Sequence, residues 1–227
     1  MMKQFLSVLT LSALSAVFAF AQEGARIRVV HASPDAPAVD VIVDGAKTLA
    51  NLPFREYSEY LSVPAKSYDI RVNVAGTATE VLSANPTLAP GRDYTVIAVG
   101  RVSGGENPLR LLLLEDDNSA PQGDQVKLRV VHGAPGAPAV DVYVTTPFES
   151  LDAKTPVLTN VPFGAASGYL TVPIQMYQGR VAVAGTKTIA IDTMRLVTWG
   201  GMIRTIIAVD TQGGGAPFDV ILLPDRG

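Results

Sequence analysis

The sequence predicts an all-β protein in which two tandem immunoglobulin-like β-sandwich modules follow an N-terminal signal peptide. Three observations support this fold class: a long motif that occurs twice, short segments of alternating apolar and polar residues between Gly- and Pro-rich turns, and no helical periodicity beyond the first residues. About seven short strands in each hundred residues are typical of a sandwich. A small barrel is the alternative.

The repeat is clearest around the only two histidines of the chain. Residues 28–41 (RVVHASPDAPAVDV) return almost unchanged as residues 129–142 (RVVHGAPGAPAVDV), an offset of 132 − 31 = 101. Later matches, such as LPF at 52–54 with VPF at 161–163, lie at an offset of 161 − 52 = 109. The second copy therefore carries an insertion of eight residues (109 − 101), and the chain divides into two modules of roughly 100 residues.

The first residues have the pattern of an export signal. Lys3 precedes an apolar run over residues 5–20, and Ala19-Phe-Ala21 stands before Gln22. The run of about 16 residues is shorter than the roughly 20 that a membrane-spanning helix needs. We therefore expect an exported protein that is periplasmic, cell-surface or extracellular and has no integral membrane segment after cleavage. The predicted parts are a signal peptide at 1–21, a first repeat at 22–118, a linker at 119–124 and a second repeat at 125–227.

Composition narrows the classes of partner. Removal of residues 1–21 takes one lysine and no acidic residue, so the mature charge is 17 − 21 = −4. A mildly acidic protein lacks the basic stripe that nucleic-acid binding requires. The absence of cysteine excludes disulfides and thiolate metal sites, so the apolar cores must stabilise the fold.

The strands are expected where apolar residues alternate or run continuously. In the first module these segments are 27–31, 39–44, 57–63, 68–74, 79–82, 94–99 and 109–114; in the second they are 128–132, 140–144, 167–172, 177–183, 188–192, 205–209 and 218–223. The runs at 94–99 and 109–114 are nearly all apolar, which is expected of strands covered on both faces or lying at a module contact.

The proline loop at 33–37 is expected to join two antiparallel strands. In that register His31 faces Val39 on the inside, while Arg28 and Asp40 lie diagonally on the outer face. Each module, expressed alone as 22–118 or 124–227, is expected to fold.

The repeated residues His31, Asp40, His132 and Asp141 raise the question of a metal or catalytic site. Zinc needs three or four convergent ligands, and each module offers one histidine and no cysteine. We therefore expect structural roles and no catalytic residues. Each imidazole is expected to bond a carbonyl of its proline loop. Each aspartate is expected to accept hydrogen bonds from loop amides or to pair with Arg28 or Arg129. A metal-dependent hydrolase centred on this His/Asp motif is the less favoured alternative.

Two other groups of residues could contact a ligand. No cofactor is expected, although Asp35, Asp40, Asp44 and residues 115–117 could supply oxygen ligands to Ca²⁺ without a recognised loop spacing. Trp199, in a Gly-flanked loop absent from the first copy, and Tyr143 could stack on a sugar. Trp199 could equally cap the end of the sandwich core.

Three motifs carry a resemblance to a known family. They are VHASPDAPAVDV at 30–41, VPFGAASGYL at 161–170 and GGAPF at 214–218. With these the chain resembles, in two tandem copies, the bacterial and archaeal family catalogued as domain of unknown function 4397. The resemblance implies an exported β-sandwich repeat of the cell envelope, with no established activity and no catalytic residues to assign.

These observations together predict a non-catalytic structural or adhesion protein of the cell envelope, or an extracellular one. Its partner would be an envelope component, a glycan or another protein, with no nucleic acid. A glycan- or peptidoglycan-binding module that uses loop aromatics is the first alternative.

Overall fold

The computed structural model describes residues 24–226, so the predicted signal peptide at 1–21 lies outside the described part. Within that part the chain is all-β, with sixteen strands and no helix. The strands of the first module are β1 (Ala25–Ala32), β2 (Val39–Val43), β3 (Ala46–Leu52), β4 (Leu61–Val63), β5 (Ile70–Val74), β6 (Glu80–Ala84), β7 (Asp93–Val99) and β8 (Arg110–Asp116). Those of the second are β9 (Gln125–His132), β10 (Val140–Thr145), β11 (Leu158–Val161), β12 (Leu170–Pro173), β13 (Gln178–Val183), β14 (Ile189–Asp192), β15 (Ile203–Val209) and β16 (Asp219–Arg226).

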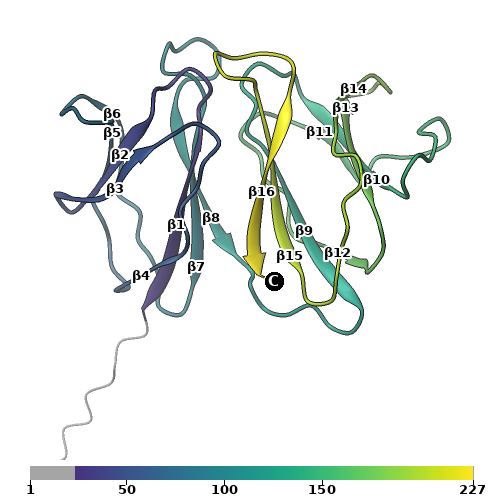
Figure 1. Cartoon of the computed structure of the whole chain (residues 1–227), viewed down its shortest axis with the longest axis horizontal. Coiled ribbons are helices and arrows are strands. Elements are labelled where there is room, and N and C mark those ends of the chain that lie inside the picture. Colours follow the sequence, from purple (N-terminus) through teal and green to yellow (C-terminus); the bar gives the residue numbers. More distant parts are fainter. Residues whose placement is uncertain (1–23, 227) are drawn as a thin grey trace, which may run out of the picture.

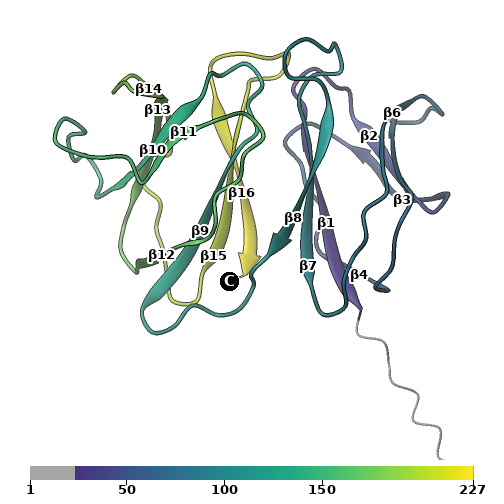
Figure 2. The ribbon, with the colours of Figure 1, turned by 180° about the vertical axis from the view of Figure 1, so that it is seen from behind.

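Each module is a sandwich of two four-stranded sheets with the same topology. In the first module the sheets run β4-β1-β7-β8 and β3-β2-β5-β6, and in the second β12-β9-β15-β16 and β11-β10-β13-β14. The central pairs β1–β7 and β9–β15 are parallel, and the other pairs are antiparallel. The sheets that contain β1 and β9 face each other at the centre of the molecule, and the other two sheets lie at its flanks (Figure 1). The reverse view gives the same arrangement (Figure 2).

The expected hairpin between the first two strands is wrong. β1 pairs with β4 and β7, whereas β2 pairs with β3 and β5 in the opposite sheet. The proline loop is therefore an arch that carries the chain from one sheet to the other. Pro34 and Pro37 have no N–H to donate to a hairpin ladder, and His31 N–H instead bonds the carbonyl of Glu56.

Two strands have no counterpart among the segments expected from the sequence. β3 and β11 are edge strands with mostly exposed or half-buried residues. Because neither strand buries a full face, neither shows the apolar alternation that marks the other strands.

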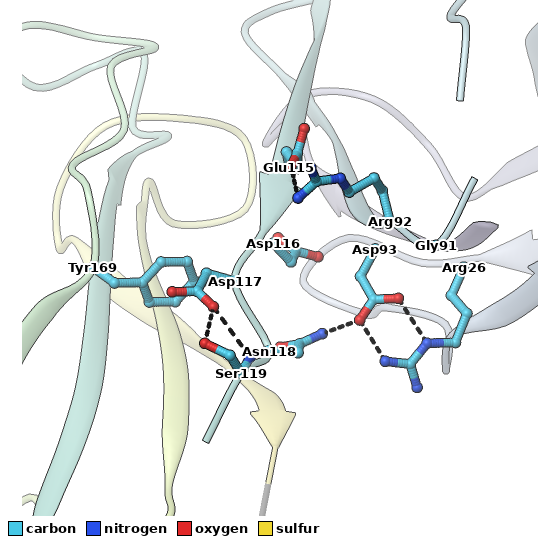
Figure 3. A pocket seen from close by; sticks show the side chains of 10 residues that line it. All are labelled: Arg26, Gly91, Arg92, Asp93, Glu115, Asp116, Asp117, Asn118, Ser119 and Tyr169. Atoms are coloured by element: carbon cyan, nitrogen blue, oxygen red, sulfur yellow. Dashed lines mark hydrogen bonds and ion pairs between the residues drawn. The ribbon is translucent and has the colours of Figure 1, made fainter. Parts of the chain in front are cut away.

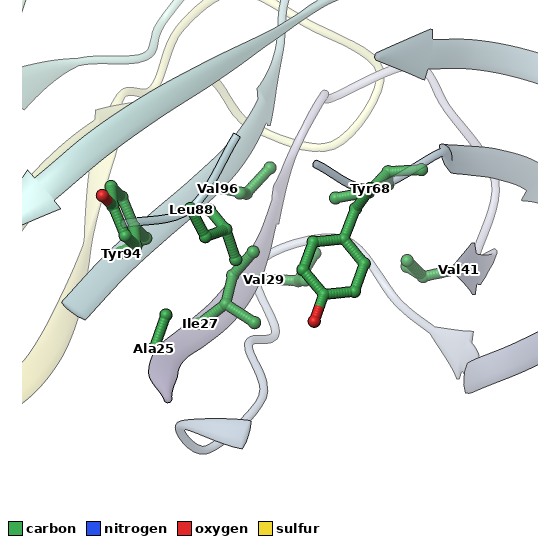
Figure 4. Packing of buried hydrophobic residues seen from close by; sticks show 9 residues of the cluster. Ala25, Ile27, Val29, Val41, Tyr68, Leu88, Tyr94 and Val96 are labelled. Carbon is green, nitrogen blue, oxygen red and sulfur yellow. The ribbon is translucent and has the colours of Figure 1, made fainter. Parts of the chain in front are cut away.

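The core of the first module lies between its two sheets. Ala25, Ile27 and Val29 of β1 pack with Tyr68, Leu88 and Val96, as Figure 4 shows. Alternate residues of a strand point to opposite faces, so the neighbours of these β1 residues point to the other face of the same sheet. That face lies against the second module.

The contact between the modules contains an apolar core of its own. Nine buried side chains from both modules form one cluster: Val30, Ala32, Ile97, Val99, Val131, Ile207, Val209, Ile221 and Leu223. Leu112 and Leu114 of β8 pack against it. Of the two explanations expected for the apolar runs at 94–99 and 109–114, a position at a module contact is confirmed. The sequence did not predict that the two modules would share a core.

Candidate functional site

Both histidines are buried at the ends of β1 and β9. His31 Nε2 lies 3.0 Å from the carbonyl oxygen of Pro37, and His132 Nε2 lies 2.9 Å from that of Pro138. These are the contacts with the proline loop that the sequence predicts. A carbonyl can only accept, so Nε2 carries the proton in each ring. Each ring also meets a phenylalanine edge to face, Phe54 or Phe163. Both imidazoles hold the arch in place.

The repeated aspartates hold loop amides. Asp40 accepts hydrogen bonds from the backbone N–H groups of Asn51 at 2.9 Å and Gly76 at 3.0 Å, and it pairs with Lys47. Asp141 does the same with the amides of Asn160 at 2.8 Å and Gly185 at 2.9 Å. The ammonium of Lys47 and the two amides lower the pKa of Asp40 to about 2. Of the two roles expected for these aspartates, the one with loop amides is confirmed.

The expected pairing of Asp40 and Asp141 with Arg28 and Arg129 is wrong. Arg28 of the first module forms an ion pair with Asp225 of the second, and Arg129 of the second pairs with Asp116 of the first. The side chains of both pairs are at most 3% exposed. The arginines lie on the face of β1 and β9 that meets the other module, while β2 and β10 belong to the opposite sheets. Each module therefore supplies the arginine of one intermodule ion pair and the aspartate of the other.

Neutral side chains complete each pair. Thr95 Oγ1 accepts from Arg28 Nε and donates to Asp116 at 2.6 Å, which links the two ion pairs. Tyr60 also donates to Asp116, at 2.6 Å, and its ring lies 4.7 Å from the guanidinium of Arg28. The second copy repeats this arrangement with Thr205, Tyr169, Arg129 and Asp225.

The tyrosines stay protonated within this network. Burial, and then the carboxylate of Asp116, raises the pKa of Tyr60, and burial together with Asp225 raises that of Tyr169. Burial alone would lower the pKa of Arg28, but the carboxylate of Asp225 raises it above its usual value. We call Arg28, Asp225, Arg129, Asp116 and their threonine and tyrosine partners the junction network. Both ion pairs of the network are buried, although Asp116 and Tyr169 also lie at the wall of a neighbouring crevice.

A polar crevice of about 460 Å³ opens beside the junction network (Figure 3). The acidic residues that could have served Ca²⁺ there each have a cation of their own: Glu115 pairs with Arg92 at 3.1 Å, Asp116 with Arg129, and Asp117 with Lys127 at 2.6 Å. Asp35 and Asp44 lie elsewhere and bind Ser103 and Lys66. Among residues 24–226, no three His, Cys, Asp or Glu side chains gather in a group that could hold a metal ion.

The two aromatic residues proposed for ligand contact differ. Trp199 is 46% exposed, and the guanidinium of Arg204 lies 5.2 Å from its ring. Tyr143 is only 2% exposed and packs with Leu151 and Ala182. The expectation that Tyr143 offers its ring to a ligand is therefore wrong, because β10 turns this side chain under the inserted loop.

The burial of the histidines predicts a pH dependence of stability. Burial lowers the pKa of both imidazoles below 6.5, the value of an unfolded histidine. Their contribution to stability is then complete above about pH 6.5 and is lost as the pH falls through the folded-state pKa values. We expect the melting temperature to fall between pH 7.5 and 5, and to fall less steeply in the double variant His31→Gln with His132→Gln. Equal slopes in calorimetric or fluorescence melts would contradict this.

A family model described as Domain of unknown function (DUF4397) matches residues 25–143, which is just over half of the chain. The match covers the first module and reaches β10 of the second. Assignment of the second copy to the same family remains a prediction. No curated protein matches the chain.

Three solved structures of carbohydrate-binding proteins are similar over most of the chain. One is a family 41 carbohydrate-binding module of a streptococcal virulence factor that recognises α-glucan, with 13% identity and a TM-score of 0.28 over 80% of this chain and 93% of that one. A second structure, of a streptococcal virulence factor that binds α-glucan, has 9% identity and a TM-score of 0.26 over 80% of this chain and 91% of that one. A family 26 module from Eubacterium rectale, in complex with maltoheptaose, has 10% identity and a TM-score of 0.26 over 89% and 98%.

No helix in the described range, 24–226, combines the length and the apolar character needed to cross a membrane.

Proposed function

This chain belongs to the family described as Domain of unknown function (DUF4397), and we propose that it is an exported, non-catalytic structural or adhesive component of the cell envelope. Its activity would lie in its outer surfaces.

One observation carries this proposal. The ionisable side chains of the repeated histidine motif (28–41 and 129–142) are engaged inside the protein: the histidines with proline carbonyls, Asp40 and Asp141 with loop amides, and the arginines across the module contact. A general base or nucleophile must reach a substrate within hydrogen-bond distance. His31 and His132 are each 1% exposed and already bonded. This use of the motif supports an architectural role for it.

A pull-down with envelope fractions tests the proposal. The mature chain, 22–227, is incubated with purified cell-wall and membrane fractions of the producing cells. We expect retention on at least one fraction, and equal retention of the double variant His31→Gln with His132→Gln. If the protein binds none of the fractions, the proposal is overturned. If the wild-type chain degrades an envelope polymer and the double variant does not, the protein is an enzyme and the proposal is overturned.

A second candidate function is glycan binding through Trp199. The observation that favours it is the exposed indole, since an exposed aromatic ring can stack on the apolar face of a sugar. A glycan array with the wild-type protein and Trp199→Ala tests it, with Val102→Ser as a control for loss of an exposed apolar residue in the first module. We expect glycan retention to fall only in Trp199→Ala. Equal retention by all three proteins would remove this candidate.

A further inference from the structure

A pocket on the outer side of the second module has the features of a binding site. Its volume is about 390 Å³, within the range of roughly 300–1,000 Å³ typical of small-ligand sites. It is lined by Pro147, Phe148, Gln178, Met194 and Arg195. We call these five residues the Phe148 pocket. These residues come from the loop after β10, from β13 and from the segment after β14, and these strands lie at the flank of the molecule (Figure 1). Trp199 is not among the lining residues.

Two apolar residues are exposed there in unfavourable backbone conformations. Phe148 is 71% exposed with φ 65°, and Met194 is 64% exposed with φ 57°. Residues other than Gly, Asn and Asp seldom adopt this left-handed backbone region, because it costs them about 1–3 kcal/mol. Because both side chains are exposed, no burial of apolar surface offsets this cost. Such strain persists where the surroundings enforce it, and it is common at binding sites.

A buried glutamine and the aspartate bonded to it hold the backbone at these two positions. Gln178, 5% exposed, accepts a hydrogen bond from Phe148 N–H at 2.7 Å and donates from Nε2 to the carboxylate of Asp192 at 2.8 Å. The same carboxylate accepts from Met194 N–H at 2.8 Å. One relay therefore fixes the two exposed apolar residues on opposite loops. A rigid, preformed pocket binds with less loss of entropy than a flexible one.

The pocket also presents a cation without a counter-charge. The guanidinium of Arg195 lies 5.0 Å from the centre of the Phe148 ring. Among residues 24–226 no carboxylate lies within ion-pair distance of Arg195. The carboxylate of Asp192, nearby in the chain, is occupied by Gln178 and Met194. An aromatic ring, a thioether and an unpaired arginine together complement an anion with an apolar portion.

Pro147 and Phe148 belong to the loop that the second copy adds, so the first module has no residues equivalent to them. Two contacts hold this inserted loop against the module. Leu151 of the loop packs against Tyr143, and Lys187 donates a hydrogen bond to the carbonyl of Lys154 in the loop. The buried Tyr143 thus supports the inserted loop that carries Phe148.

From these observations we infer that the Phe148 pocket binds a peptide terminus in which an apolar side chain adjoins a free carboxylate. The carboxylate would pair with Arg195, and the apolar side chain would lie against Phe148 and Met194. The polar groups of the pocket are few, and both ends of the Gln178 amide are already bonded. A neutral sugar, which must satisfy many hydroxyls, therefore matches it less well. The inference goes beyond the proposed function, because it names a ligand and a site.

Titration of the mature chain with N-acetyl-leucyl-phenylalanine, followed by NMR or calorimetry, tests this inference. We expect a Kd on the order of 0.1–1 mM. The C-terminal amide of the same dipeptide, which lacks the charge, and N-acetyl-glycyl-glycine, which lacks the apolar side chains, should each bind about tenfold more weakly. Glucuronic acid and maltoheptaose serve as the sugar arm. Equal binding of acid and amide, or binding of a sugar in preference to the peptide, would overturn the inference.

Variants localise the site and separate it from a structural role. Arg195→Gln and Phe148→Gly should each weaken peptide binding about tenfold, and Arg92→Gln and Val102→Ser, exposed residues of the first module, should leave it unchanged. Glycine accepts φ 65° without strain, so Phe148→Gly should lose binding while its melting temperature stays the same or rises. A lowered melting temperature with intact binding would contradict a binding role for Phe148. The dipeptide titration and the envelope pull-down use different ligands. A failure of the dipeptide to bind would therefore not change the pull-down result on which the proposed function depends.

Discussion

Replacement of Asp225 by asparagine is expected to lower the free energy of unfolding by about 3–5 kcal/mol. The change leaves the guanidinium of Arg28, whose side chain is 2% exposed, in the module contact without its ion-pair partner. Removal of one member of a buried ion pair is costly because the remaining charge cannot regain its hydration. Thr205 and Tyr169 also lose the charged acceptor of their hydrogen bonds. Equilibrium unfolding of the mature chain in urea measures the loss.

Two comparisons make this result specific. Asp116→Asn should cost as much as Asp225→Asn, because the pseudo-symmetric network gives Arg129 the same environment. Asp69→Asn, which removes the partner of the exposed Arg71, should leave the unfolding midpoint almost unchanged. If Asp225→Asn is no more harmful than Asp69→Asn, the junction network does not bear on stability.

A double replacement distinguishes charge from packing. Arg28→Met combined with Asp225→Leu removes both charges and keeps the volume apolar. Such replacements are often neutral or better than the single ones, so the double variant should recover part of the loss in Asp225→Asn.

The strands and the faces of β1 were predictable because the information is local. Alternation at 27–31 placed Ile27 and Val29 on one face and Arg28 on the other, and the structure agrees. The sheet partners were not predictable in the same way. The prolines of residues 33–37 mark a turn, but a turn alone does not determine whether the next strand stays in the same sheet or crosses to the other.

The reciprocal ion pairs could not be read from the repeat. Each copy contains an arginine, Arg28 or Arg129, and a later aspartate, Asp116 or Asp225, so pairing within a module and pairing between modules satisfy the same sequence. Asp116 also stands in the acidic segment 115–117, just before the predicted linker at 119–124. One signal was present: Asp116 and Asp225 both follow a run of leucines at the same offset as the repeated tyrosines.

Only one part of the Phe148 pocket, the inserted loop, could be predicted from the sequence. The insertion in the second copy was clear, and it indicates a feature that the first module lacks. Its contact with Met194 and Arg195, which follow β14, depends on the pairing of β13 with β10 and β14. Nothing in the local pattern of these residues marks that juxtaposition.

Separation of the modules is expected to have the largest effect of all, which reverses the expectation from the repeat that each module folds when expressed alone. Each half, 22–118 or 124–227, would expose its part of the shared apolar cluster and would leave Arg28 or Arg129 without its partner. Exposed apolar surface of this kind favours aggregation or association. Each half alone should therefore be unfolded or self-associated, although each also contains a core between its own sheets.

Circular dichroism and sedimentation of the two halves, alone and after mixing in equal amounts, test most directly whether the repeated arginines serve to join the modules. The account predicts that the halves, poorly folded or aggregated when alone, form a one-to-one complex with the melting behaviour of the intact chain, and that Asp225→Asn in the second half prevents its assembly. Two halves that are monomeric, separately folded and indifferent to each other would contradict it.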